Sequence, residues 1–174
     1  MALGSKRDAA LTLIGAWVMG SIFMAVVATQ NFYLIDRLLA AGLVQGFNDV
    51  VASLGSDMAR EFMRYVSSEL NRLFFIAWGI VQIGMGALLL WLVWHSESKR
   101  VRVGACAMCI LAVVLTVGLT PAIVSVGRAL DFVPRDPPPS ELNTFGLIHA
   151  AYSLVDFAKT GLSLLVAFWI HRNS

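Results

Sequence analysis

Four long apolar runs take up most of this chain of 174 residues. The runs cover about residues 9–35, 73–94, 103–128 and 144–170. Each reaches the roughly 20 residues that a helix needs to cross the hydrocarbon core of a bilayer. Helices and closed barrels are the only structures that satisfy their backbone hydrogen bonds in lipid. The sequence therefore predicts an all-α protein, a single four-helix bundle that spans the membrane.

The overall composition agrees with this class. The chain is 58% hydrophobic and 14% charged, with a mean hydropathy of +0.75, whereas soluble domains carry about 25% charged residues. The net charge of +2 is small and the basic residues are dispersed, so we expect the lipid bilayer, and not nucleic acid, as a partner. No GxSxG, P-loop or HExxH motif occurs in the sequence, which argues against an enzyme without deciding the question.

A fifth helical segment precedes the second apolar run. Apolar residues recur every three or four positions from Val51 to Tyr65, and charged residues fall elsewhere around the helix. This pattern predicts an amphipathic helix over about residues 50–72, outside the hydrocarbon core. Because no Pro or Gly lies between Ser56 and Trp78, we expect this segment to run on into the second span as one long helix.

Pro121 interrupts the third run. A proline inside a helix removes one backbone hydrogen bond, so we expect a kink at which the hydroxyl of Thr116 or Thr120 helps to satisfy the freed backbone. The segment from Asp131 to Ser140 contains four prolines and predicts a stiff, extended loop that leads to the fourth span.

The basic residues near the ends of the runs predict the orientation. Most of those beside short connections lie on one side of the membrane: Lys6, Arg7, Lys99, Arg100, Arg102 and Arg172. The positive-inside rule assigns this side to the cytoplasm. We therefore expect both termini to be cytoplasmic, in a bacterial inner membrane, with the chain forming a homo-oligomer or a subunit of a larger membrane complex.

The fourth run carries polar side chains on one stripe. They recur at spacings of three and four: His149, Tyr152, Asp156, Lys159 and Ser163. An ionised Asp or Lys at mid-bilayer costs roughly 2.5–3.5 kcal/mol on insertion scales. The stripe should therefore face protein, where these groups find partners.

Two interpretations of this stripe stay open. In the first, an outward-facing polar cavity between the second and fourth spans binds or conducts a small ion or solute. Its candidate lining residues are Arg72, Gln82, His149, Tyr152, Asp156 and Lys159. Gln82 joins them because it lies at about the same depth as Asp156 if the two helices are antiparallel. In the second interpretation, an ion pair of Asp156 with Lys159 only fixes helix packing in a structural subunit.

A metal or redox role is a further alternative. Cys106 and Cys109 form a CxxC near the cytoplasmic end of the third run, where two thiols three positions apart can face the same way. Paired thiolates bind soft ions such as Cu(I), with Met85 or Met108 as a third donor, or cycle as a redox dithiol.

His149 is a candidate haem ligand. The other two histidines, His95 and His171, lie at the cytoplasmic end of their helices, while His149 lies near the outer end. Haem held between bundle helices needs both axial ligands at one depth. A haem site would therefore pair His149 with a ligand of another type, or be shared across a dimer.

The sequence resembles the DUF4149 family of four-helix membrane proteins, which includes the eukaryotic transmembrane protein 205 group. The resemblance rests on scattered residues in all four spans: Trp17, Gly20, Phe23, Ala28, Phe32, Leu70 to Arg72, Gly84, Pro121, Phe145, Ile148 and His149. The first helix of the sequence is also distantly similar to that of CopD-type copper-resistance membrane proteins. The resemblance implies a four-helix integral membrane protein, with metal or drug resistance suggested for eukaryotic relatives, and it carries over only His149 as a matching site position.

Overall fold

The computed structural model describes residues 3–42, 44–96, 98–134 and 136–172. Within these ranges every regular element is a helix and no strand occurs. Four stretches are long and apolar enough to cross a membrane: Lys6–Ala41, Ser56–Val93, Lys99–Ala129 and Glu141–Arg172. The predicted all-α membrane fold is confirmed.

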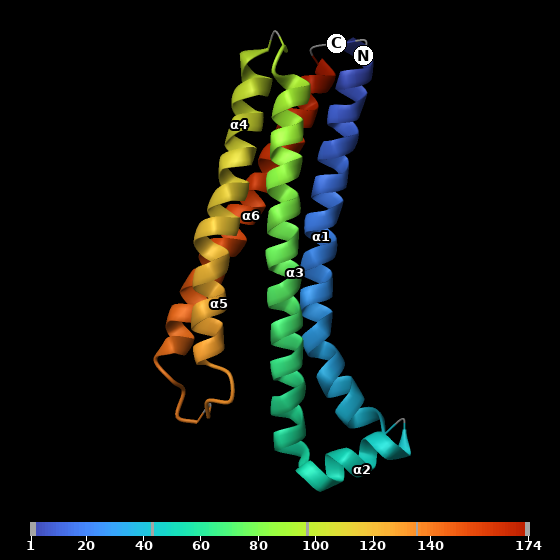
Figure 1. Ribbon diagram of the computed structural model, residues 1–174, viewed down its shortest axis with the longest axis vertical. Coiled ribbons are helices and arrows are strands. Elements are labelled where there is room, and N and C mark those ends of the chain that lie inside the picture. The colour runs from blue at the N-terminus through green and yellow to red at the C-terminus, as the bar shows by residue number, and fades with distance from the viewer. Residues whose placement is uncertain (1–2, 43, 97, 135, 173–174) are drawn as a thin grey trace.

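Helices α1 (Leu3–Ala41) and α3 (Ser56–Val93) lie antiparallel and side by side, and the short helix α2 (Gln45–Leu54) joins them (Figure 1). Gly55 separates α2 from α3 with a φ of 80°, a conformation that favours glycine. The amphipathic segment expected from about residue 50 is therefore divided at Gly55. From Ser56 onward it continues without a break into the second span, as expected.

The third span is a continuous rod of three helical segments. These are α4 (Lys99–Val113), the π-helix η1 (Val114–Leu119) and α5 (Thr120–Ala129). The irregularity expected at Pro121 takes the form of this six-residue π segment directly before it.

The two threonine hydroxyls bond carbonyls within and just before the π segment. Thr116 Oγ1 donates to the Ala112 carbonyl at 2.7 Å, and Thr120 Oγ1 donates to the Leu115 carbonyl at 2.8 Å. Both hydroxyls are thus satisfied by their own helix, and π segments of this kind often occur at functional sites.

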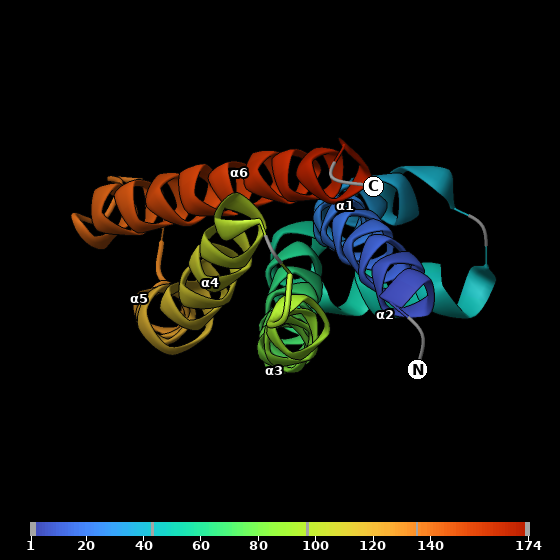
Figure 2. The same ribbon diagram turned by 90° about the horizontal axis from the view of Figure 1, so that it is seen from above.

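Helix α6 (Glu141–Arg172) closes the bundle by packing against α4, α5 and α1. Seen from above, it runs along one side of the other helices (Figure 2). Both termini and the α3–α4 connection lie at one end of the bundle, which we call the terminal end (Figure 1). Helix α2 and the α5–α6 connection lie at the opposite end, which we call the loop end.

The apolar core sits in the half of the bundle near the terminal end. Helices α1, α3, α4 and α6 all contribute buried side chains to it: Ala10, Ile14, Trp17, Leu89, Val93, Val101, Ala105, Met108, Ala112, Val166 and Ile170. Toward the loop end the pair α1 and α3 diverges from the pair α5 and α6 (Figure 1). The bundle is therefore closely packed in one half. In the other half, which we call the split half, the two helix pairs lie further apart.

Helices α1 and α3 are longer than a bilayer requires. Their 39 and 38 residues give lengths of about 57–58 Å, against a hydrocarbon core of about 30 Å. Exposed Trp91 and Trp94 at the terminal end are typical of a membrane interface. Arg72 lies about 33 Å along α3 from Trp94, which places it at the level of the other interface. The part of α3 before Arg72 exceeds the length that a hydrocarbon core requires.

Candidate functional site

Lys159 is the most unusual side chain of the bundle. It lies on α6 and is 1% exposed, although lysine is almost never fully buried without a partner. Its ammonium forms an ion pair with Asp156 Oδ1, one turn away, at 2.5 Å. It also donates a hydrogen bond to Gln82 Oε1 of α3. Two partners from two helices therefore compensate for the burial of this charge.

Trp17 of α1 completes this cluster. Its indole Nε1 donates to the same Gln82 Oε1 at 2.9 Å, and the Lys159 Nζ lies 5.9 Å from the centre of the Trp17 ring. Trp17 and Gln82 are each 1% exposed. One amide oxygen thus accepts bonds from two helices, and the cluster ties α1, α3 and α6 together inside the membrane.

Asp156 is the partly exposed member of the cluster. Its side chain is 28% exposed, in contrast to its fully buried partner Lys159. One turn further toward the loop end, half-buried Tyr152 contacts the Phe75 ring edge-on at 5.7 Å. Asp156 and Tyr152 are therefore the polar side chains that follow Lys159 on this face of α6 in the direction of the loop end.

The opposite direction is closed by apolar side chains. Ser163 Oγ donates back to the Lys159 carbonyl at 2.8 Å, so its hydroxyl is occupied. Beyond it on the same face of α6 come Val166 and Ile170, both in the apolar core. The apolar core thus lies between Lys159 and the terminal end.

One buried hydroxyl close to this cluster has no partner. Ser21 lies one turn from Trp17 on the same stripe of α1 and is 7% exposed. Its Oγ makes no hydrogen bond within the described part of the chain. Buried polar groups are normally satisfied, so an orphan beside a polar cluster is a position where a bound molecule would gain a hydrogen bond.

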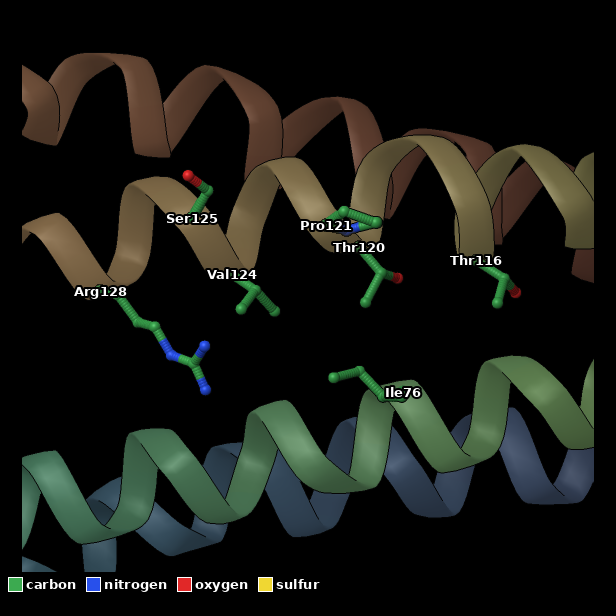
Figure 3. A pocket seen from close by; sticks show the side chains of 7 residues that line it. All are labelled: Ile76, Thr116, Thr120, Pro121, Val124, Ser125 and Arg128. Carbon is green, nitrogen blue, oxygen red and sulfur yellow. The ribbon is translucent and has the colours of Figure 1, made fainter.

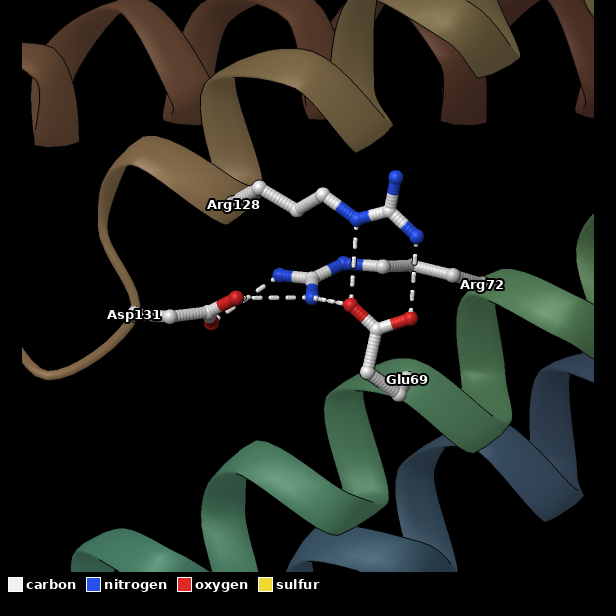
Figure 4. Close-up of polar contacts among 4 residues, drawn as sticks. All are labelled: Glu69, Arg72, Arg128 and Asp131. Carbon is white, nitrogen blue, oxygen red and sulfur yellow. Dashed lines mark hydrogen bonds and ion pairs between the residues drawn. The ribbon is translucent and has the colours of Figure 1, made fainter.

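Arg72 belongs to a different cluster, at the membrane interface of the loop end (Figure 4). Its guanidinium donates to both oxygens of Asp131, at 2.8 and 3.0 Å, and to Glu69 at 2.6 Å. Arg128 in turn makes a bidentate pair with Glu69, both distances being 3.1 Å. These four residues, which we call the interface ion network, join α3 to the end of α5 across the split half.

His149 also lies apart from Lys159. It is exposed and stacks on Phe145 of the same helix, with the ring centres 5.9 Å apart and the planes 21° from parallel. Of the six residues predicted for one cavity, the structure therefore brings together Gln82, Asp156 and Lys159, with Tyr152 adjacent. Arg72 and His149 lie outside this group.

A pocket in this part of the bundle lies between α3 and the segment formed by η1 and α5, whereas the predicted cavity lies between α3 and α6 (Figure 3). It has a volume of about 520 Å³, and none of the six predicted cavity residues lines it. Its lining comes from one position of α3 and from η1 and α5: Ile76, Thr116, Thr120, Pro121, Val124, Ser125 and Arg128.

The two cysteines are free thiols on α4, and both are half-buried. Cys109 packs against α3 at Gly86, where an added Cβ would lie 3.1 Å from the sulfur. Within the described ranges, no three His, Cys, Asp or Glu side chains come close enough to hold a metal ion together. His95 and His171 are exposed at the terminal end, far from His149. Over the residues that the structure describes, the two thiols and His149 are thus not joined by a further His, Cys, Asp or Glu, and Met85 or Met108 as a third donor to the thiols stays a prediction.

Sequence reasoning missed Trp17, Glu69, Arg128 and Asp131. The signal for Trp17 was present, because it lies about 16 Å along α1 from Lys6, and Lys159 lies about 20 Å from Arg172 at the same end. A comparison of these two depths would have predicted that Trp17 of α1 and Lys159 of α6 lie near each other. No comparable signal pointed to Asp131, which follows the end of α5 in a loop.

No protein-family model, curated protein or solved structure matches this chain. The resemblance to the DUF4149 family stays a prediction.

Proposed function

We propose that this protein is a non-enzymatic membrane protein whose site around Lys159 binds or conducts a small ion or solute that enters from the loop end. The observation that carries the proposal is the burial of Lys159 at mid-membrane, held by Asp156 and Gln82 from two helices. Ionisable groups at this depth are expensive and by default mark a functional site. The partly exposed Asp156 and the orphan Ser21 hydroxyl give an incoming ligand two groups to contact.

The basic residues at the terminal end support an orientation for this site. With the positive side cytoplasmic, the termini are inside and the site opens to the outside of a bacterial inner membrane. The halves of α1 and α3 at the loop end, with α2, then lie outside as well, where a second copy or another membrane subunit can bind them.

The proton is the first ion to test, because Asp156 and Lys159 both carry groups that exchange protons. Purified protein in vesicles loaded with a pH-sensitive dye is exposed to a potassium diffusion potential set by valinomycin. We expect proton flux above that of protein-free vesicles. The double variant Asp156→Asn with Lys159→Met removes both charges together and should abolish the flux.

A matched control removes another ion pair. Arg60 pairs with Asp36 at 3.1 Å on the exposed part of the molecule. The variant Asp36→Asn with Arg60→Met makes the same change of charge there and should keep the flux. A folded double variant at Asp156 and Lys159 with normal flux would sink the proposal.

A purely structural subunit is the second candidate. The observation that favours it is that Gln82 Oε1 joins three helices through bonds that need no ligand. Under this role, the double variant would lose assembly or stability and no wild-type flux of any ion would be found.

A further inference from the structure

The pocket between α3 and α5 is chemically unlike the site at Lys159. Four polar residues line it, Thr116, Thr120, Ser125 and Arg128, and the two threonines both donate their hydroxyl to a carbonyl of their own helix. These two hydroxyls therefore demand no partner from a ligand. Ile76, Pro121 and Val124 supply the apolar part of the wall (Figure 3). This wall fits an apolar chain better than a polar solute.

A second, polar hollow adjoins this pocket. It has a volume of about 350 Å³ and is lined by Tyr65, Glu69, Arg128 and Asp131. Arg128 lines both spaces, so they meet at its side chain. We call the first pocket the groove. An apolar groove that ends in a polar hollow is the shape of a site for an amphiphile.

The depth of the hollow matches the headgroup region of a bilayer. The hollow contains part of the interface ion network, which lies about 33 Å along α3 from Trp94. This separation is close to the thickness of the hydrocarbon core, about 30 Å. The groove therefore extends from the interface into the hydrocarbon, as a lipid does.

The charges of the hollow select the kind of headgroup. The network holds two arginines and two carboxylates, so its formal charge is balanced. Arg128 uses Nε and Nη2 for Glu69, and its remaining nitrogen points away from that carboxylate (Figure 4). This free edge is a donor for a phosphate, while the Asp131 and Glu69 carboxylates have lone pairs left for an N–H donor.

We propose that the groove and the hollow together bind one phospholipid with a zwitterionic primary-amine headgroup, a phosphatidylethanolamine. One acyl chain lies between α3 and α5, the phosphate contacts the free edge of Arg128, and the ammonium contacts the carboxylates beside it. The volume of the groove falls within the roughly 300–1,000 Å³ of typical small-molecule sites. This inference is independent of any function of Lys159.

Native mass spectrometry of the delipidated, full-length protein in detergent tests the proposal. Dioleoyl phosphatidylethanolamine, phosphatidylcholine and phosphatidylglycerol are titrated at equal concentrations. We expect the ethanolamine lipid to bind tightest, because choline has no N–H to donate and glycerol has no cation for the carboxylates. Arg128→Gln should weaken its binding about fivefold to tenfold, the effect of one cation near a membrane surface. Arg60→Gln, the matched control, should leave binding unchanged.

Two variants test the groove from opposite walls. Val124→Trp fills it from α5 and Ile76→Trp fills it from α3, and either should abolish retention of the lipid. Circular dichroism identifies the variant that keeps its helices, and that one decides the test. Glycerophosphoethanolamine, the headgroup without chains, should not displace the lipid.

The following results would overturn the proposal. Equal or tighter binding of the choline or glycerol lipid would refute recognition of the amine. Unchanged lipid binding in a folded groove variant would refute the binding of an acyl chain in the groove. Full displacement by glycerophosphoethanolamine would mean that the hollow is a site for the polar group alone.

Discussion

The Lys159 ammonium of α6 and the Gln82 side-chain oxygen of α3 are hydrogen-bonded, although 77 positions separate them in the chain. The same oxygen accepts the Trp17 indole N–H. We therefore expect Gln82→Leu, which keeps the volume and removes the acceptor, to destabilise the protein by about 1–2 kcal/mol, the upper part of the range for hydrogen bonds between membrane helices. Unfolding by sodium dodecyl sulfate in maltoside micelles measures this. Gln30→Leu, at an exposed position of α1, is the control and should change little.

The ion pair inside α6 should behave as a coupled unit. Lys159→Met leaves the Asp156 carboxylate without its cation, and breaking a buried pair costs roughly 3–5 kcal/mol. Adding Asp156→Asn removes the stranded charge, so the double variant should recover much of this loss. The same unfolding assay, run as a double-mutant cycle, gives the coupling free energy. Additive effects of the two substitutions would contradict the pairing.

The two arginines of the interface ion network should differ in importance. Arg72 has a side chain 10% exposed and binds both Asp131 and Glu69, whereas the Arg128 side chain is 59% exposed. We expect Arg72→Gln to approach the roughly 3–5 kcal/mol of a broken buried pair, and Arg128→Gln to cost far less, because exposed ion pairs contribute little to stability. Thermal unfolding in detergent compares the two. Equal losses would mean that burial does not separate them.

Close contact between α3 and the π-helix η1 depends on a glycine. A Cβ added at Gly79 would lie 2.7 Å from Thr116 Oγ1 and 2.8 Å from Thr116 Cγ2, too close for either atom. Gly79→Ala should therefore destabilise the bundle by about 1–3 kcal/mol through overpacking. Gly84→Ala, in the same helix with nothing within 4 Å of its added Cβ, should be neutral or slightly stabilising. Unfolding of both variants in one detergent is the measurement.

The sequence was sufficient for the features that depend on local pattern. Hydropathy located the four spans because each is a continuous apolar run. The absence of Pro and Gly between Ser56 and Trp78 predicted the long α3. The spacing of three between Asp156 and Lys159 predicted that they can meet, and their depth pointed to Gln82 as a partner.

The features that could not be predicted depend on how the helices pack. The sequence predicts that Arg72 lines one cavity with Gln82, but Arg72 binds both oxygens of Asp131, which lies in a loop 59 positions away. A proline predicts a disturbed helix without specifying its form, so the π segment before Pro121 was not foreseen. The position of the pocket follows from that segment and from the divergence of α5 from α3.

The π segment also has a consequence for how this chain tolerates change in length. A π segment is equivalent to one residue added to an α-helix, and one residue turns a helix by about 100°. Deleting a single residue between Val114 and Leu119 would therefore restore an ordinary α-helix and leave the residues after it facing as they do now. Arg128 would stay beside Glu69, and Thr120 would stay in the groove. The same deletion in the regular helix of α4 would turn everything after it by about 100°, so the π segment is the place in the third span where loss of one codon should be tolerated best.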